Sequence, residues 1–424
     1  MTPQGRKMFE TLMKTQTMSR DAIVAYQHGL LEKLCRHARL RVPFYRDSGC
    51  LDSLFDGDRF DMSGWDKVPV LTREAAYANR RELTATEVPR FMAPLTPGQT
   101  SGSTGTPLPF LRTSLSSYAS EALTARGLAW RGLGVGKPTA ISKAVTGDVG
   151  AREAGEPLQT QNGSVHFVNF FHKPLEQCAE LDRIRPRLVI SYPSIVHSWI
   201  LADGGACLES VEAILLTGET CREETAQAIR AAFKGHVINL YSASEAGPMA
   251  IQGPRGDLKV CEENLWMEEP SAALSAESRL RPHPVIITPY YAHATPLIRY
   301  APGDYAIWGN PDKATPGLRS LERITGRVRN MFKRPDGTLF WPNLSSVKLR
   351  KIAHFTHRQL IQESFERFVL RVVFDAPPDD GQVRQFQAHI AEVTGARDVV
   401  IEAVSGINDN RTNGKSYEDF ICLI

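Results

Sequence analysis

The sequence predicts an α/β protein in which a large domain of helix-covered sheets precedes a small α+β domain. Its 424 residues exceed the length that a single hydrophobic core usually serves. From Leu175 to Tyr241 short apolar strands alternate with helical segments, which is typical of sheets covered by helices. Beyond Gly326 the pattern changes to strands around one helix. We therefore expect one domain over residues 1–325 and a second over residues 326–424.

Composition and charge exclude several classes of protein. A hydrophobic content of 42% and a charged content of 23% are ordinary for a soluble globular chain. The net charge of +3 favours neither a nucleic acid nor a membrane surface as partner. No apolar run is long enough to cross a bilayer, and the N-terminus lacks the core of a signal peptide. The seven cysteines are irregularly spaced without a CxxC pair, so we expect a reduced, cytoplasmic protein without a disulfide framework.

The segment up to Arg90 is expected to be mainly helical. Apolar residues recur at helical spacing over residues 22–41, and this helix must end before Pro43. Residues 42–45 and 68–71 are expected as extended connectors. A loop over residues 100–107 follows, and then residues 109–111 predict a short strand. Residues 114–130 predict a helix capped by Ser114 or Ser116.

The alternating region and the C-terminal part supply the remaining elements. Apolar runs predict buried strands over 187–191, 211–217 and 237–241, and amphipathic runs predict helices over 193–201 and 223–233. Residues 285–287 and 297–300 are expected as strands of a more antiparallel section. In the C-terminal domain we expect strands over 368–374, 399–402 and 420–424 and a helix over 381–394. No internal repeat is present.

The loop over residues 100–107 has the composition of a phosphate-binding segment. Its sequence, Thr-Ser-Gly-Ser-Thr-Gly-Thr-Pro, places two glycines among hydroxyl side chains. Glycine lets backbone N–H groups turn to one side, and short hydroxyls add donors without bulk. The loop lacks the Gly-Lys-Ser/Thr ending of a Walker A motif. By itself the same composition is equally typical of a surface linker.

Carboxylates follow predicted strands at three places. Glu245 comes directly after the strand that ends near Tyr241, Asp304 follows the strand that ends at Tyr300, and Glu219 follows Thr217. Ligands of α/β folds bind at the carboxyl ends of strands. Any one of these carboxylates is more often a turn or a helix cap. Their combination with the loop and a late Gly414-Lys415 pair favours a binding site.

An ordered series of motifs makes the sequence similar to a known family. The chain resembles the adenylate-forming superfamily of acyl- and aryl-CoA ligases, and within it the phenylacetate-CoA ligase and CapK-like branch, over nearly its whole length. The motifs are Val42-Pro-Phe-Tyr, Val68-Pro-Val-Leu-Thr, the loop at residues 100–107, Ser191-Tyr-Pro-Ser, Thr217-Gly-Glu, the run from Tyr241 to Glu245, Pro296 to Tyr300 with Gly303-Asp304, Gly326-Arg327 and Gly414-Lys415.

The resemblance implies a role for each motif, with ATP or AMP and Mg²⁺ as cofactors. Phosphates would be held by Ser101, Gly102, Ser103, Thr104 and Gly105. The adenine would be bordered by Thr217, Gly218, Glu219, Tyr241, Ser242 and Ser244. Asp304 would accept hydrogen bonds from the ribose, and Arg327 would contact the ribose or the α-phosphate. Glu245 would bind Mg²⁺. Lys415, on a mobile C-terminal lid, would neutralise charge during adenylation; an ordinary solvated lysine is the alternative.

The resemblance also implies an acid substrate and an acceptor. The wall around the acid would include Tyr192, Phe170, His172, Ala243 and Gly247, which favours an aromatic acid, although aromatic clusters are more often core. The acceptor would be coenzyme A. Lys333 to Thr338 replace the turn that normally helps to form the pantetheine tunnel, and the new turn resembles that of a phenazine-pathway ligase. An amine, a hydroxyl or a carrier-protein thiol therefore remains an alternative acceptor.

The sequence also supports expectations about the hinge, a zinc site, catalysis and the oligomeric state. Val328-Arg329-Asn330 stands where the family usually places an acidic hinge pair, which still permits rotation of the lid. Residues 305–321 contain no cysteine, so no structural zinc is expected in this protein. A protein that binds AMP without turnover is the alternative from a different class, and retention of Lys415 argues against it. The oligomeric state is left open, with a homodimer among the options.

Overall fold

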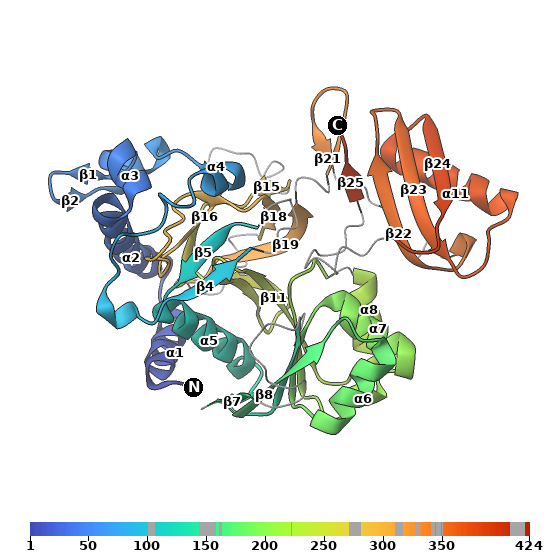
Figure 1. Cartoon of the computed structure of the whole chain (residues 1–424), viewed down its shortest axis with the longest axis horizontal. Coiled ribbons are helices and arrows are strands. Elements are labelled where there is room, and N and C mark those ends of the chain that lie inside the picture. Colours follow the sequence, from blue (N-terminus) through green and yellow to red (C-terminus); the bar gives the residue numbers. More distant parts are fainter. Residues whose placement is uncertain are drawn as a thin grey trace. The chain divides into compact units, whose positions relative to one another are not determined.

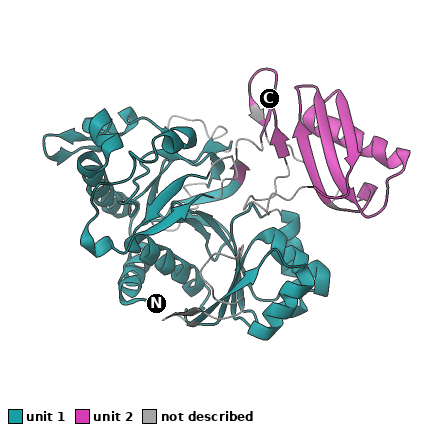
Figure 2. Cartoon of the chain, in the orientation of Figure 1, with its two compact units in different colours: residues 1–324 teal, residues 325–424 magenta. Residues whose placement is uncertain are grey.

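The computed structural model of the chain describes residues 1–100, 107–143, 158–160, 163–221, 223–270, 281–309, 317–327, 331–340, 344, 349, 351–407 and 420–424. The chain divides into two compact units, residues 1–324 and residues 325–424 (Figure 2). The division falls one residue before the expected boundary. Among the described residues, no helix has the length and apolar character needed to cross a membrane.

The N-terminal segment is helical, as predicted. Arg20–Arg41 forms one long helix, and Pro43 begins the next instead of an extended connector. The prediction for residues 42–45 was wrong because proline is favoured at the first helical position, where its missing N–H costs nothing. The elements here are α1 (Pro3–Thr15), α2 (Arg20–Arg41), α3 (Pro43–Ser48), η1 (Asp52–Leu54), β1 (Phe55–Asp56), β2 (Arg59–Phe60), η2 (Met62–Lys67), β3 (Leu71–Thr72), α4 (Arg73–Ala78) and η3 (Arg90–Met92).

An 11-stranded sheet forms the body of unit 1, in the order β15-β18-β19-β13-β12-β11-β10-β9-β6-β8-β7. The strands β8, β6, β9, β10 and β11 run parallel, and β9, β10 and β11 are the strands that the alternating pattern predicted. The bounds of this part are β6 (Thr139–Lys143), β7 (Leu158–Thr160), β8 (Gly163–Asn169), α6 (Pro174–Ile184), β9 (Leu188–Ser191), α7 (Pro193–Asp203), η4 (Ala206–Leu208), β10 (Ala213–Leu216), α8 (Glu223–Ala232) and β11 (His236–Ala243).

Both faces of the parallel strands are buried. In β10, Ile214 and Leu216 belong to the core under α6, α7 and α8, while Ala213 and Leu215 belong to the core under α1 and α5 (Figure 1). This two-sided burial explains why β10 is a continuous apolar run. Helix α5 (Ser114–Ala129) is capped by Thr113, whose hydroxyl accepts from the Ser116 N–H at 3.1 Å. The predicted caps Ser114 and Ser116 instead lie inside the helix.

Antiparallel strands complete unit 1. They are β4 (Thr96–Gln99), β5 (Pro109–Arg112), β12 (Gly247–Gln252), β13 (Leu258–Val260), β14 (Leu265–Met267), β15 (His283–Pro284), β16 (Ile287–Pro289), β17 (Tyr300–Ala301), β18 (Asp304–Trp308) and β19 (Ser320–Arg327). The strand expected over 297–300 is reduced to its last residue, because Arg299 adopts a left-handed conformation with φ +52°. Its guanidinium pairs with both Glu268 oxygens at 2.8 Å, which holds the chain in this turn.

Unit 2 contains a small α+β core. Four strands in the order β24-β23-β22-β25 share one hydrophobic cluster with α11, and Phe386 and Ile390 of the helix are fully buried in it. The predicted helix and strands of this region are present. The bounds are β20 (Phe332–Lys333), β21 (Leu339–Phe340), β22 (Phe355–Gln362), β23 (Arg367–Phe374), α11 (Asp380–Thr394), β24 (Asp398–Ala403) and β25 (Phe420–Cys422).

Candidate active site

The parallel strands β9, β10 and β11 bring three predicted segments to one edge of the sheet. Their aligned register places Ser191 beside Leu216 and Leu216 beside Asn239. Beyond the strand ends, the Thr217 N–H donates to the Ser191 carbonyl at 3.0 Å, and the hydroxyls of Thr217 and Ser242 lie 2.9 Å apart. Residues that are 25 or more positions apart in the chain therefore meet at the carboxyl edge, where α/β folds bind ligands.

Tyr241 and Asp304 form a direct pair at this edge. The Tyr241 hydroxyl donates to Asp304 Oδ2 at 2.8 Å. Tyr241 comes from β11, and Asp304 begins β18 immediately after Gly303, whose φ of +89° turns the chain into that strand. Both side chains are half-buried. The contact holds the ring of the tyrosine next to the acid.

Glu245 lies in the turn between β11 and β12 and is half-buried. Burial raises the pKa of its carboxyl; the positive charge of Arg73 opposes this shift, and the negative charge of Asp304 adds to it. The buried phenol of Tyr300 interacts with the same carboxyl, and burial raises the pKa of that phenol as well. Two carboxylates that repel one another in a partly buried place form a donor set that suits a hard dication.

Thr100 closes the base of the predicted phosphate loop. Its N–H donates to the Leu108 carbonyl at 3.0 Å, and its hydroxyl accepts from the Leu108 N–H at 2.9 Å. A guanidinium N–H of Arg73 donates to the same hydroxyl at 2.7 Å, and both side chains are buried. Sequence reasoning missed Arg73. Its signal was its position directly after the Val68-Pro-Val-Leu-Thr motif.

Glu219 follows β10 in the chain, and its side chain reaches the first turn of α7. Its two carboxylate oxygens accept from the Ser194 N–H at 3.2 Å and from the Ser194 hydroxyl at 3.0 Å. Gly218 has φ +80°, and a Cβ there would lie 2.4 Å from the Tyr192 ring, so only glycine fits this contact. The three residues thus form one packed corner: the ring of Tyr192, the bare backbone of Gly218 and the carboxylate of Glu219.

The aromatic residues predicted for the acid wall lie partly together. The rings of Phe170 and Tyr192 make an edge contact at 5.8 Å between centroids, and Phe170 also meets Phe171 at 4.7 Å. Phe170 and Tyr192 are half-buried and pack against the core under α6 and α7. His172 is exposed, and its ring lies 3.4 Å from the Asn169 amide nitrogen.

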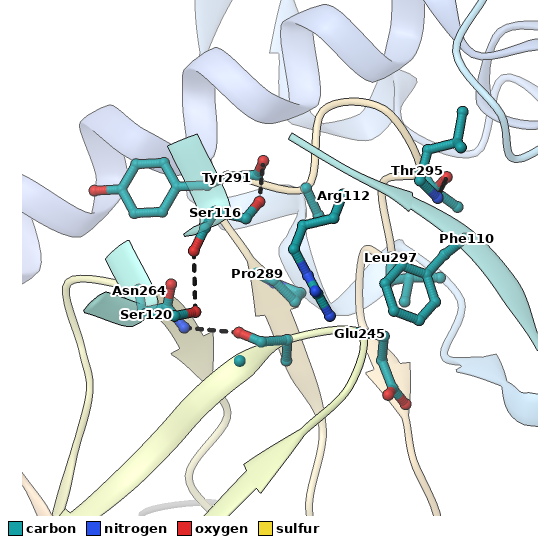
Figure 3. A pocket seen from close by; sticks show the side chains of 14 residues that line it. Phe110, Arg112, Ser116, Ser120, Glu245, Asn264, Pro289, Tyr291, Thr295 and Leu297 are labelled. Atoms are coloured by element: carbon teal, nitrogen blue, oxygen red, sulfur yellow. Dashed lines mark hydrogen bonds between the residues drawn. The ribbon is translucent and has the colours of Figure 1, made fainter. Parts of the chain in front are cut away.

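A pocket opens beside Glu245, between β5, α5 and the start of β12 (Figure 3). Gly247 lines it with φ +70°, and a Cβ there would meet the Ser120 hydroxyl at 2.7 Å. Ala243 is half-buried and ends β11, one strand position before this turn. The half-buried Arg112 also lines the pocket and donates to the Ser244 carbonyl at 2.8 Å, which sequence reasoning missed.

Several predicted residues lie outside the described part of the chain. These are the loop residues Ser101, Gly102, Ser103, Thr104 and Gly105, the hinge segment 328–330 and Lys415 with Gly414. Arg327 is the last residue of β19, and only its backbone is described. Their roles therefore stay predictions. The described residues bring together Tyr241, Asp304 and Glu245 on one side and Tyr192, Thr217 and Ser242 on the other.

Comparisons with known proteins agree with this fold. No family model matches the sequence. The protein CapK of Staphylococcus aureus is 22% identical over 210 residues, which are 48% of this chain and 45% of that protein, so the match spans less than half of either. A crystal structure of 2-hydroxyisobutyryl-CoA ligase with 2-HIB-AMP, in the postadenylation state, matches with a TM-score of 0.68 at 17% identity, over 90% of this chain and 86% of that one. O-succinylbenzoate coenzyme A synthetase (MenE) from Bacillus subtilis, with ATP and magnesium ion, matches with a TM-score of 0.53 at 14% identity, over 78% and 70%.

Proposed function

Since this chain has the fold of the adenylate-forming acid–CoA ligases, we propose that it activates a carboxylic acid with ATP. The carboxylate attacks the α-phosphorus, an acyl-AMP forms and pyrophosphate leaves. The acyl group then passes to a thiol, with release of AMP. The observation that carries the proposal is the 2.8 Å contact between Tyr241 and Asp304, set beside Glu245 at the carboxyl edge of the sheet.

The nucleotide would bind along this edge. Asp304 would accept hydrogen bonds from the ribose hydroxyls, a task that suits a side chain with two acceptor oxygens. Thr217, Gly218 and Ser242 would border the adenine. The phosphates would lie against the loop that Thr100 closes, and the buried guanidinium of Arg73 holds the base of that loop. Lys415 and Arg327 would add positive charge from unit 2, as the resemblance implies.

Glu245 would hold Mg²⁺ together with the phosphates of ATP. The raised pKa of its carboxyl reflects burial without a full positive partner, and a hard dication would supply that charge. When bound, the ion would neutralise phosphate charge and make pyrophosphate a better leaving group. Arg73 keeps Thr100 in place, and the buried phenol of Tyr300 interacts with the Glu245 carboxyl.

The acid is proposed to be aromatic. The half-buried rings of Phe170 and Tyr192 stand edge to face, and the bare backbone of Gly218 lies against Tyr192. Together with Ala243 and Gly247, these residues would border a flat slot for the acid, as the resemblance implies. A planar ring fits such a slot with little loss of conformational entropy. A role of this same activity in a phenazine-type pathway is proposed from the resemblance of the Pro-Asp-Gly turn.

Coenzyme A is the proposed acceptor, and a tight hairpin in unit 2 keeps the alternatives open. Strands β20 and β21 are joined by residues 334–338, and Asp336 accepts from the Thr338 N–H at 2.9 Å and from its hydroxyl at 2.7 Å. This closed turn replaces the one that normally lines the pantetheine tunnel. A carrier-protein thiol, an amine or a hydroxyl would therefore serve the same adenylate. The seven free cysteines support a reducing, cytoplasmic setting.

Pyrophosphate release tests this proposal most directly. We expect release with one member of a panel of aromatic acids, ATP and Mg²⁺, raised by coenzyme A, together with an acyl thioester in the mass spectrum. Asp304→Ala should abolish release, whereas Asp66→Ala, at an exposed aspartate of the same unit, should leave it unchanged. Lys415→Ala should lose adenylation and keep AMP binding.

The outcomes separate the alternatives. Pyrophosphate release without a thioester would support adenylation, and it would indicate that the acyl acceptor is an amine, a hydroxyl or a carrier-protein thiol. Aliphatic acids that release pyrophosphate faster than every aromatic one would contradict the aromatic slot. AMP binding without release, for aromatic and aliphatic acids alike, would support the non-catalytic homologue instead.

A further inference from the structure

Two thiols and a carboxylate converge in the helical layer of unit 1, away from the strand-end site. Cys178 lies in α6, Asp203 ends α7, and Cys207 lies in η4 directly after it. One ligand atom of each residue lies within 4.8 Å of the others. Both cysteines are buried, with 3% and 2% of their surface exposed, while the aspartate is half-buried and reaches solvent.

The carboxylate of this cluster is fixed by the backbone. Asp203 Oδ1 accepts from the Gly205 N–H at 2.8 Å, and Oδ2 accepts from the Cys207 N–H at 2.9 Å. Metal-ligating carboxylates are held in this way by outer hydrogen bonds, which orient the ligand before the ion binds.

We propose that Cys178, Cys207 and Asp203 form a binding site for a thiophilic divalent cation such as Zn²⁺. In the metal-free protein both thiols are protonated. Binding breaks two S–H bonds, forms two metal–sulfur bonds and one metal–oxygen bond, and releases two protons to solvent. The site carries one negative charge before the exchange and one after it, because a dication replaces two protons. Burial therefore adds no new charge penalty.

Distances favour a metal over a disulfide. The two sulfur atoms lie 3.2 Å apart. A tetrahedral site with metal–sulfur bonds of about 2.3 Å sets its sulfurs about 3.8 Å apart, so they must separate by about 0.6 Å. A disulfide, with a bond of about 2.05 Å, requires an approach of about 1.2 Å through the packed helices.

The position of the cluster gives the ion a structural role. Gln177, next to Cys178, donates to the Phe170 carbonyl at 3.3 Å and to the His172 carbonyl at 2.6 Å, and it accepts from the Trp199 indole at 2.8 Å. An ion bound by Cys178 would tie α6 to the end of α7. It would thereby stiffen the segment that carries Phe170. Water reaching past Asp203 would complete the tetrahedron.

Metal binding to the reduced full chain tests the proposal independently of any catalysis. With a phosphine reductant present, we expect one Zn²⁺ per chain in competition with a chromogenic chelator, and a thiolate-to-metal charge-transfer band with Co²⁺. Cys178→Ser and Cys207→Ser should each weaken Zn²⁺ binding by at least about tenfold. The matched control Cys221→Ser removes a half-buried thiol outside the cluster and should bind as the wild type does.

Thermal unfolding provides the second readout. Zn²⁺ should raise the Tm of the wild type and of Cys221→Ser, and it should leave the Tm of Cys207→Ser unchanged. Asp203→Asn keeps an acceptor for one backbone N–H, so it should fold. It should bind Zn²⁺ more weakly than the wild type. This variant keeps the test decisive if a cysteine variant fails to fold. No tight Zn²⁺ binding by the reduced wild type, or an equal loss in Cys221→Ser, would overturn the proposal.

Discussion

At the scale of single residues, the hydrogen bond from Tyr241 to Asp304 is the contact on which nucleotide binding is proposed to depend. We expect Tyr241→Phe to weaken AMP binding by about tenfold, because loss of a hydrogen bond to a carboxylate costs about 1.5 kcal/mol. The fold should survive, since the ring is retained. Isothermal titration with AMP measures the change.

Tyr305→Phe is the matched control for this experiment, because it removes a half-buried phenol from the neighbouring position in β18. Its AMP affinity should equal that of the wild type. Equal losses in both variants would mean that the effect comes from the strand and not from the pair. An unchanged AMP affinity in Tyr241→Phe would show that the Tyr241 hydroxyl does not contribute to nucleotide binding.

A buried histidine predicts acid sensitivity. Burial, reinforced by the charge of His37 at 5.0 Å between ring centroids, lowers the pKa of His293 to about 4. A lowered pKa means that the folded chain binds a proton less readily than the unfolded chain does. The stability from this group is therefore complete above pH 6.5 and is lost as the pH falls towards 4, by up to about 3 kcal/mol.

Denaturant unfolding between pH 7 and pH 4.5 measures this loss. His293→Gln, which cannot take up a proton, should show a smaller fall in unfolding free energy than the wild type. Arg41 and Glu87 also act on His37, so the comparison is made at constant salt. The exposed His354 is the control, and His354→Gln should follow the wild-type curve. Identical pH curves for all three proteins would show that protonation of His293 does not cause the loss of stability.

At the scale of elements, helix α7 depends on a carboxylate from another element. Its N-cap residue, Tyr192, makes no capping hydrogen bond through its side chain, and Glu219 accepts from Ser194 instead. We expect Glu219→Ala to lower the free energy of unfolding by about 1 kcal/mol, the usual cost of a lost N-cap. Glu209→Ala, at an exposed site nearby, should have no effect. An unchanged stability in Glu219→Ala would assign this carboxylate to ligand binding alone.

At the scale of the whole molecule, a fully buried ion pair joins three segments of unit 1. Arg126 of α5 and Glu263 lie 2.6 Å apart with no exposed surface on either side chain, and Thr15 of α1 donates to the same oxygen at 2.7 Å. We expect Arg126→Met to cost about 3–5 kcal/mol, because it leaves a buried charge without its partner. Calorimetry of the purified chain measures the loss.

The double variant tests the cause of that loss. Arg126→Met with Glu263→Leu removes both charges, so it should recover part of the stability that Arg126→Met loses. A double variant that is as unstable as the sum of the two single variants would mean that packing, and not the stranded charge, sets the cost.

The two compact units have separate cores, and this organisation is also testable. Phe386 is fully buried in the core of unit 2. We expect Phe386→Ala to cost about 3–5 kcal/mol in the unfolding of that unit. Its calorimetric transition should move while the transition shifted by Arg126→Met stays in place. One transition that moves with both substitutions would show that the units unfold together.

The local pattern of the sequence determined the elements that are buried on both faces or end at strong signals. The parallel strands β9, β10 and β11 were predicted from their apolar residues, and both faces of β10 lie in cores. Helix α11 was predicted within one residue, because Asp379 and Gly395 mark its ends. The carboxylates Glu245 and Asp304 were also identified from the sequence, since each directly follows an apolar segment.

Only the tertiary structure decided which distant side chains meet. Arg73 reaches Thr100 and Glu245, and Cys178 reaches Cys207, through packing that no local spacing encodes. The left-handed turn at Arg299 likewise depends on Glu268, 31 residues earlier, because this ion pair offsets the strain of a positive φ. Short-range propensities set the backbone of each element. The site, in contrast, depends on contacts between elements, and these contacts contribute free energy only after the chain has folded.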